Sequence, residues 1–300
     1  MRCDRTTHWI VFFMMIAVFG LSACNYSGRS SYNPKNDIDF DTIVVNEKYY
    51  LGNNANNDRH DTSCNISLRF VYPKNARDNR MQELQRMFVR FVFGTAYDSL
   101  LPHEAATQYV RNYIDNYKAD AATYRKNVGG DDQPDAAALY GEDLNSPIFY
   151  SYYESLSDSI TFNSYKVLSF QVKQSNNKGG AMSYKSYRNY VINLKTGKLI
   201  TENDIFNPGY DTALRPLFIN SLLKQNQVKG VKELEELGYF GMDEIMPNKN
   251  FLVGEKGITY TFNKGEYSAY QLNAPEIFIP YSDILSLLRE NTVVYKLADS

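Results

Sequence analysis

The chain has 300 residues, of which 43% are hydrophobic, 14% aromatic and 22% charged. This length and composition are sufficient to bury a sizeable core, in one large domain or two small ones. With 32 basic and 34 acidic residues the formal net charge is -2. Such a balance argues against a nucleic-acid partner, and we expect none.

The first residues have the order of a secretory signal. Arg2 and Arg5 precede an apolar run from Trp9 to Phe19, which is too short to span a bilayer as a stable helix. The run ends in Leu21–Cys24, which resembles a bacterial lipobox. We therefore predict a lipoprotein signal peptide over 1–23 and lipidation at Cys24. An ordinary cleaved signal with a chance cysteine and an uncleaved anchor are the alternatives.

Processing at this site would leave an extracytoplasmic body tethered to the membrane by acyl chains alone. Cys3 would be discarded and Cys24 acylated, so Cys64 would have no partner for an internal disulfide. We expect Cys64 to be a small buried hydrophobe. Asn25 is not the aspartate that commonly retains lipoproteins at the inner membrane, and no acidic run follows Cys24. The expected location is the outer membrane of the cell envelope, with the body facing the periplasm.

In the first half of the body, polar residues 24–38 predict a flexible tether. Alternating and β-prone residues then predict strands over Phe40–Leu51 and Ser63–Tyr72. Apolar residues at spacings of three and four predict a helix over Asp78–Phe93. A second helix is expected after Pro102, and it should fray near Val128.

In the second half of the body the spacing of apolar residues changes several times between that typical of strands and that typical of helices. Beyond an acidic connection at 131–135, we expect an antiparallel meander with strands at 148–153, 159–162, 167–172 and 187–194. Helices are predicted over Asp211–Gln225 and Lys232–Leu237, with Pro216 either kinking the first or marking its start. The chain should end in strands at 251–253, 257–262 and 276–279, followed by a short helix after Pro280.

Separate blocks of strands and helices predict the α+β class, with antiparallel or mixed sheets and helices packed on one face. The prediction includes two small domains. An N-terminal α+β companion domain would span 39–177, and a C-terminal α+β domain would span 178–300.

Two segments carry a resemblance to a bacterial family. Tyr190–Phe206 is similar to a "strand, tGK, D-[IL]-F" segment, and Asn250–Ile284 is similar to an "nF, Gl-f-f, v-iPY-dl" ending. Together they resemble the extracytoplasmic domain of RsiV-type anti-sigma factors and PdaC-type deacetylases, with its N-terminal companion. Many relatives have a "GGAH" turn where this chain has Gly179–Met182, so any ligand role of that histidine would be lost here. If the glycines only make a tight turn, nothing is missing.

The resemblance implies a binding module, because the RsiV-type sensors recognise lysozyme. We expect no cytoplasmic sigma-binding segment and no transmembrane helix here, which makes signalling across the membrane unexpected. The catalytic carbohydrate-esterase domain of the deacetylases has no counterpart in the sequence.

Motifs for chemistry are missing from the sequence. His60 and His103 lack further metal ligands at suitable spacing. No nucleophile elbow, metalloprotease helix or phosphate loop occurs. The acidic residues at 131–135 lack the spacing of a calcium-binding loop. We therefore predict no catalytic residue, no metal site and no cofactor.

Tyrosines are the candidate binding residues, since an aromatic face can hold a protein or a sugar. The candidates are Tyr150, Tyr152, Tyr184, Tyr187, Tyr270 and Tyr281. Core and sheet packing is the competing interpretation, because alternation places Tyr150 and Tyr152 on one side of a strand and Tyr153 on the other. The expected function is an envelope binding protein for a protein or cell-wall glycan ligand, with lysozyme-like binding implied by the resemblance. A peptidoglycan or polysaccharide hydrolase, or a protein associated with a deacetylase, is the alternative.

Overall fold

The computed structural model describes residues 35–51, 63–76, 80–129, 151–178, 184–269 and 272–299. They belong to one compact unit, Lys35–Ser300. The predicted signal peptide, Cys24, the acidic connection, Gly179–Met182, Tyr150 and Tyr270 lie outside the described residues, as does the side chain of Tyr184.

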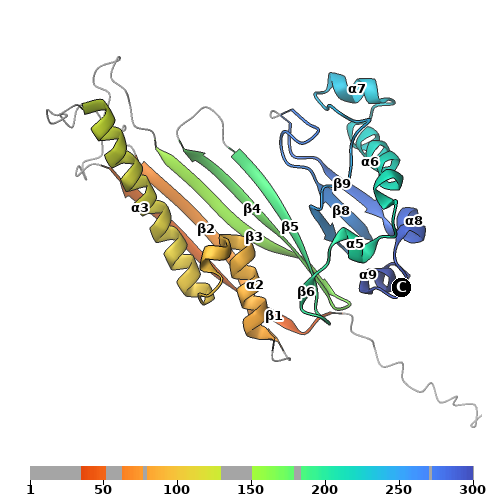
Figure 1. The fold of residues 1–300 in the computed structure, drawn as a ribbon, viewed down its shortest axis with the longest axis horizontal. Helices are drawn as coiled ribbons and strands as arrows, with labels where there is room; N and C mark the ends of the chain where they lie inside the picture. Colours follow the sequence, from red (N-terminus) through yellow and green to blue (C-terminus); the bar gives the residue numbers. More distant parts are fainter. Residues whose placement is uncertain are drawn as a thin grey trace, which may run out of the picture. The chain divides into compact units, whose positions relative to one another are not determined.

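A six-stranded sheet forms the first part of the unit (Figure 1). Its strands lie side by side in sequence order: β1 (Ile38–Tyr50), β2 (Ser63–Ala76), β3 (Tyr152–Ser164), β4 (Val167–Lys178), β5 (Tyr184–Asn193) and β6 (Lys198–Leu199). All neighbours are antiparallel except β2 and β3, which are parallel. A parallel pair needs a long crossover. Here the crossover contains two helices.

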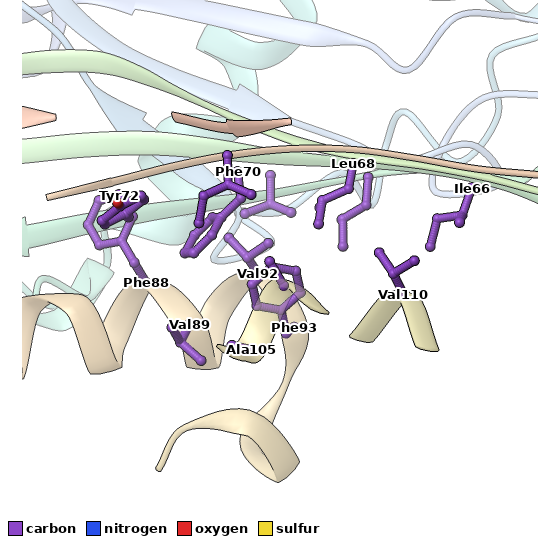
Figure 2. Close-up of a cluster of buried hydrophobic side chains, with 14 of the residues drawn as sticks. Ile66, Leu68, Phe70, Tyr72, Phe88, Val89, Val92, Phe93, Ala105 and Val110 are labelled. Carbon is purple, nitrogen blue, oxygen red and sulfur yellow. The ribbon is translucent and has the colours of Figure 1, made fainter. Parts of the chain in front are cut away.

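These helices cover one face of the sheet. They are α2 (Met81–Phe93) and α3 (Pro102–Gly129), with the short 3-10 turn η1 (Thr95–Tyr97) between them. Figure 2 shows the alternate side chains of β2, from Ile66 to Tyr72, meeting the apolar stripes of α2 and α3. The ring of Phe88 stacks on that of Phe170 with centroids 4.2 Å apart. The α+β prediction, with a mixed sheet and helices on one face, is confirmed.

A second, three-stranded antiparallel sheet follows, with β7 (Phe251–Val253), β8 (Gly257–Thr261) and β9 (Glu276–Pro280). The helical elements around it are α5 (Glu202–Ile205), α6 (Tyr210–Asn226), α7 (Val231–Glu236), α8 (Tyr281–Ile284), η2 (Leu285–Leu287) and α9 (Val293–Ala298). They enclose a second hydrophobic core that includes Phe218, Tyr260 and Phe262. Val167 on β4 and Val191 on β5 belong to this core. β7 therefore covers one end of the face of the six-stranded sheet that lies opposite α2 and α3.

Several element boundaries differ from the prediction. The strands expected at 148–153 and 159–162 are one strand, β3, because pairing with both β2 and β4 holds its polar middle extended. The following turn is at Tyr165 and Lys166, which both have positive φ. Pro216 lies inside α6, where Leu214 and Phe218 on either side are fully buried. Their burial outweighs the one helical hydrogen bond that proline removes.

The end of the predicted tether is held in the fold. Asn36 is 4% exposed, and its side-chain amide donates to the carbonyl oxygen of Val167 at 2.8 Å. Its Oδ1 accepts from the backbone N–H of Lys166 at 2.7 Å. Residues 35–38 therefore belong to the folded body. Among the described residues, no helix has both the length and the apolar composition that crossing a membrane requires.

Candidate functional site

Of the tyrosines predicted to bind a ligand, the three with described side chains do not come together. Tyr152 lies on the helix-covered face, where its hydroxyl donates to Asp120 at 3.1 Å and its ring packs against Tyr117. Tyr187 lies on the opposite face of the sheet, with the Lys173 ammonium 5.9 Å from its ring centroid. Tyr281 belongs to the second core.

Tyr281 belongs to one of the two motifs that carry the family resemblance, and residues of these motifs stabilise the scaffold. Its side chain is buried, and its hydroxyl donates to the carbonyl oxygen of Gly254 at 2.8 Å. Burial raises the pKa of this phenol above its usual value. Gly257 is the glycine of the same motif, and a Cβ at this position would overlap the carbonyl oxygen of Ile279 on β9. In the first motif, the Asp204 carboxylate accepts from the backbone N–H of Thr201 at 2.8 Å, at the start of α5.

Asn250, the asparagine of the "nF" motif, joins the two sheets. Its Oδ1 accepts from the backbone N–H of Asn189 on β5 at 2.8 Å. Its Nδ2 donates to the carbonyl oxygens of Tyr187 at 3.0 Å and Thr261 at 2.8 Å. The Asn189 amide in turn donates to the Thr261 hydroxyl at 2.9 Å. The motif residues are thus bound into the scaffold.

Three buried carboxyl groups are the natural candidates for chemistry, and two of them lie on the helix-covered side of β3. Glu154 is 3% exposed and accepts from the Tyr109 hydroxyl and from Gln174. Burial of the Tyr109 hydroxyl raises its pKa, and the negative charge of Glu154 raises it further. Asp158 is 2% exposed, and its Oδ1 accepts from the backbone N–H of Val71 at 2.7 Å. Both carboxyl groups therefore serve as partners within the fold.

The third carboxyl group, Glu202, is 4% exposed at the start of α5. One of its oxygens accepts from the Tyr210 hydroxyl and the other from the backbone N–H of Lys249, both at 2.9 Å. Burial and this hydrogen bond raise the pKa of Tyr210 to about 12. Both oxygens of Glu202 therefore have partners within the fold.

Three cavities occur beside the segment 189–204. Their volumes are about 360, 210 and 480 Å³. The first contains Arg80, Glu83 and Lys166, the second contains Glu202, and the third is lined by Asp204 and Lys296 among others. The first is also lined by Asp37, and no three metal-ligating side chains cluster within the part of the chain that the structure describes.

The remaining candidate is the part of the sheet surface opposite α2 and α3 that β7 leaves uncovered, which we call the open face. Because side chains alternate along a strand, every second residue of β1 to β5 points there. Strand register aligns them in rows: Val44, Asn46 and Lys48 of β1; Asn65, Ser67 and Arg69 of β2; Tyr153, Ser155 and Ser157 of β3; Lys173, Ser175 and Asn177 of β4; Lys185 and Tyr187 of β5.

The open face is exposed and polar. All of its side chains except Ser175 are at least partly exposed, with Val44 at 61% and Tyr153 at 44%. The Ser67 hydroxyl donates to Asn46 at 2.8 Å, and Arg69 donates to the main-chain oxygen of Asp158 at 3.2 Å. Such a surface leaves hydroxyl, amide and cationic groups in water, where a ligand can reach them.

The charged side chains of the open face are all cationic. The open face has four cationic side chains, Lys48, Arg69, Lys173 and Lys185, and none of its positions is acidic. Among the described residues, none of these cations forms an ion pair. This contrasts with the whole chain, whose net charge is -2.

Of the residues predicted to bind, only Tyr187 is described on this face. The serines, the cations and Tyr153 were not predicted as site residues. A signal was present in the sequence, since 153–159 alternates Tyr-Ser-Ser-Ser with Glu-Leu-Asp. Splitting this stretch between two strands concealed the alternation. The positions that β4 and β5 contribute depend on pairing register, which the sequence does not specify.

Comparison with known proteins identifies solved structures with a similar fold. Residues 203–282 match the model of a family described as a protein of unknown function (DUF3298). A solved member of the DUF3298 family from Bacteroides fragilis NCTC 9343 is 24% identical, with 89% of this chain and 100% of that chain covered and a TM-score of 0.76. A DUF3298 family protein from Pseudomonas aeruginosa PAO1 is 12% identical, with 85% and 97% covered and a TM-score of 0.55. No curated protein matches the chain. Residues 203–282 are thus similar to the DUF3298 family, and the chain shares the fold of these two structures.

Proposed function

We propose that this chain is a lipid-anchored envelope protein that binds a protein or cell-wall ligand without transforming it. The open face is the observation that carries the proposal. It offers exposed hydrogen-bonding and cationic side chains across five strands. Extended, exposed surfaces suit large ligands, whereas small substrates are enclosed in concave sites.

The proposed anchor is the acyl-modified Cys24, and the proposed location is the outer membrane, facing the periplasm. The apolar run, the lipobox-like Leu21–Cys24 and the residue Asn25 support this proposal. The folded body begins at Lys35, so the polar residues between Cys24 and Lys35 would separate it from the lipid surface.

The resemblance to RsiV-type sensors and PdaC-type deacetylases adds support, because the segment similar to DUF3298 lies in the matching part of the chain. By that resemblance, a lysozyme-like muramidase is a candidate protein ligand. The open face carries four cations and no acid, so a basic protein would be repelled from this surface. A muramidase would therefore have to bind elsewhere on the body.

The test is co-sedimentation of the full chain, purified in mild detergent, with insoluble cell-wall material. Ser157→Trp places a bulky side chain in the middle of the open face, and Ser282→Trp places the same side chain at an exposed position on α8. We expect saturable binding by the wild type and by Ser282→Trp, and at least tenfold weaker binding by Ser157→Trp.

Equal binding by both variants, or no binding by the wild type, would contradict the proposal. Incubation with muropeptides, with and without divalent metals, tests the alternative that the protein is a hydrolase. We expect the muropeptides to be unchanged, and any product would favour that alternative.

A further inference from the structure

We infer that the ligand of the open face is an acidic polysaccharide, extended across β2 to β5. This inference rests on the proposed function and names the chemical class of the ligand. It follows from the charge, the composition and the spacing of the side chains on that face.

The charge points to an anionic ligand. Lys48, Arg69, Lys173 and Lys185 are all exposed, and no carboxylate forms an ion pair with them among the described residues. Asp158 of β3, whose main-chain oxygen accepts from Arg69, has its carboxyl group buried on the helix-covered side of the sheet. Unpaired cations on one surface attract an anion over about a Debye length and favour its orientation.

The composition favours a polysaccharide over a protein. The middle of the face consists of serine and asparagine side chains, whereas the centres of protein interfaces are depleted in serine and lysine and rich in apolar and aromatic residues. The one exposed aliphatic side chain among these positions, Val44, lies on the edge strand β1. Hydroxyl and amide groups in rows match a ligand that carries many hydroxyl groups of its own.

Two tyrosines in the rows of β3 and β5 supply stacking surfaces. Tyr153 lies between Asn65 and Asn177 in its row, and Tyr187 lies beside Lys173. The two tyrosines are two strands and four residues apart, which corresponds to roughly 15 Å. A ligand that reaches both must be an extended chain of several sugars rather than a single sugar.

The probe for this inference is polygalacturonate, with its methyl-esterified form as the matched uncharged polymer. Binding to the full chain in mild detergent is measured by isothermal titration at low salt and in 1 M salt, where the Debye length is about 3 Å. We expect the acid form to bind at least tenfold more tightly than the ester at low salt. This preference should disappear in 1 M salt.

Variants locate the interaction. Lys173→Gln/Lys185→Gln should weaken binding of the acid form about tenfold, because each exposed ion pair contributes a factor of about two to five. Lys224→Gln/Lys232→Gln on α6 and α7 removes the same charge from other exposed positions and should have no effect. Tyr153→Ala should weaken binding of both polymers, whereas Phe240→Ala, at a side chain of similar exposure, should not.

Equal affinity for acid and ester, no binding of either, or equal effects of the two lysine pairs would overturn the inference. The proposed function has a separate readout in cell-wall binding by Ser157→Trp. If Ser157→Trp abolishes cell-wall binding while polygalacturonate does not bind, the open face is a binding site for another ligand. An acidic protein that competes for this face would be one such ligand.

Discussion

Asp158 should make the protein less stable as the pH rises from 4 to 7. Its carboxyl group is 2% exposed, and one oxygen, Oδ2, has no hydrogen-bond partner among the described residues. Burial raises the pKa of Asp158 from 3.8 to about 7, although the hydrogen bond from Val71 and the charge of Arg69 act in the opposite direction. Desolvation is thus the dominant effect.

The size and sign of the effect follow from this pKa shift. Between pH 4 and 7 the folded protein holds a proton on Asp158 that the unfolded chain has lost, so stability falls with increasing pH. One pKa unit corresponds to 1.36 kcal/mol. A shift of about three units therefore gives an upper limit of about 4 kcal/mol. The contribution is fully present below pH 3.8 and is lost as the pH rises through about 7.

The test compares urea unfolding of the wild type and Asp158→Asn at pH 4, 5.5 and 7. Asparagine keeps an oxygen that can accept from Val71 but does not titrate. We expect the stability difference between the two proteins to change by about 2 to 4 kcal/mol over this range, in favour of the variant at pH 7. Parallel pH profiles for the two proteins would refute the reasoning, because other titrating groups affect both equally.

Three further predictions concern the scaffold, each measured by urea unfolding at pH 7. Phe88→Ala should cost about 3 to 5 kcal/mol, because it removes a fully buried ring that stacks on Phe170; a loss below about 1 kcal/mol would contradict this packing. Asn250→Ala should cost about 3 kcal/mol, because it leaves several groups between the two sheets without partners; a neutral effect would mean that water replaces the amide. Gly257→Ala should cost about 3 kcal/mol or prevent folding, because its Cβ would overlap Ile279, and a fully stable variant would show that the two strands can separate.

Elements with a clear period were predictable from the sequence. The stripe over Asp78–Phe93 indicated a helix, and α2 buries Leu84, Phe88 and Val92 along that stripe. The short apolar run Phe251–Val253 was likewise found as β7. In both cases the apolar pattern of the segment itself determines the element.

The middle of β3 was not predictable in this way. Its helix-facing positions include Glu154 and Asp158, so the usual contrast between apolar and polar positions is lost. The parallel pairing of β2 with β3 joins residues almost 90 positions apart in sequence, as in the pair Cys64 and Tyr152. No local pattern specifies such a pairing.

The candidate site was likewise not fully predictable from local sequence patterns. The prediction placed candidate tyrosines on a sheet, but a tyrosine's environment depends on which element packs against it. Tyr281 is buried in the second core, whereas Tyr153, placed on the opposite side from the candidates, is exposed on the open face.

The burial of Cys64, which raises its pKa to about 11, was predicted from its strand-like context.

Site-specific photo-crosslinking with cell-wall material tests most directly whether the open face is the ligand-binding surface. A photoreactive phenylalanine derivative is placed at Ser157 on the open face or at Thr123, an exposed position on α3. The proposed function predicts crosslinks to cell-wall material from Ser157 and none from Thr123. Crosslinks from Thr123 alone, or equally from both positions, would contradict it.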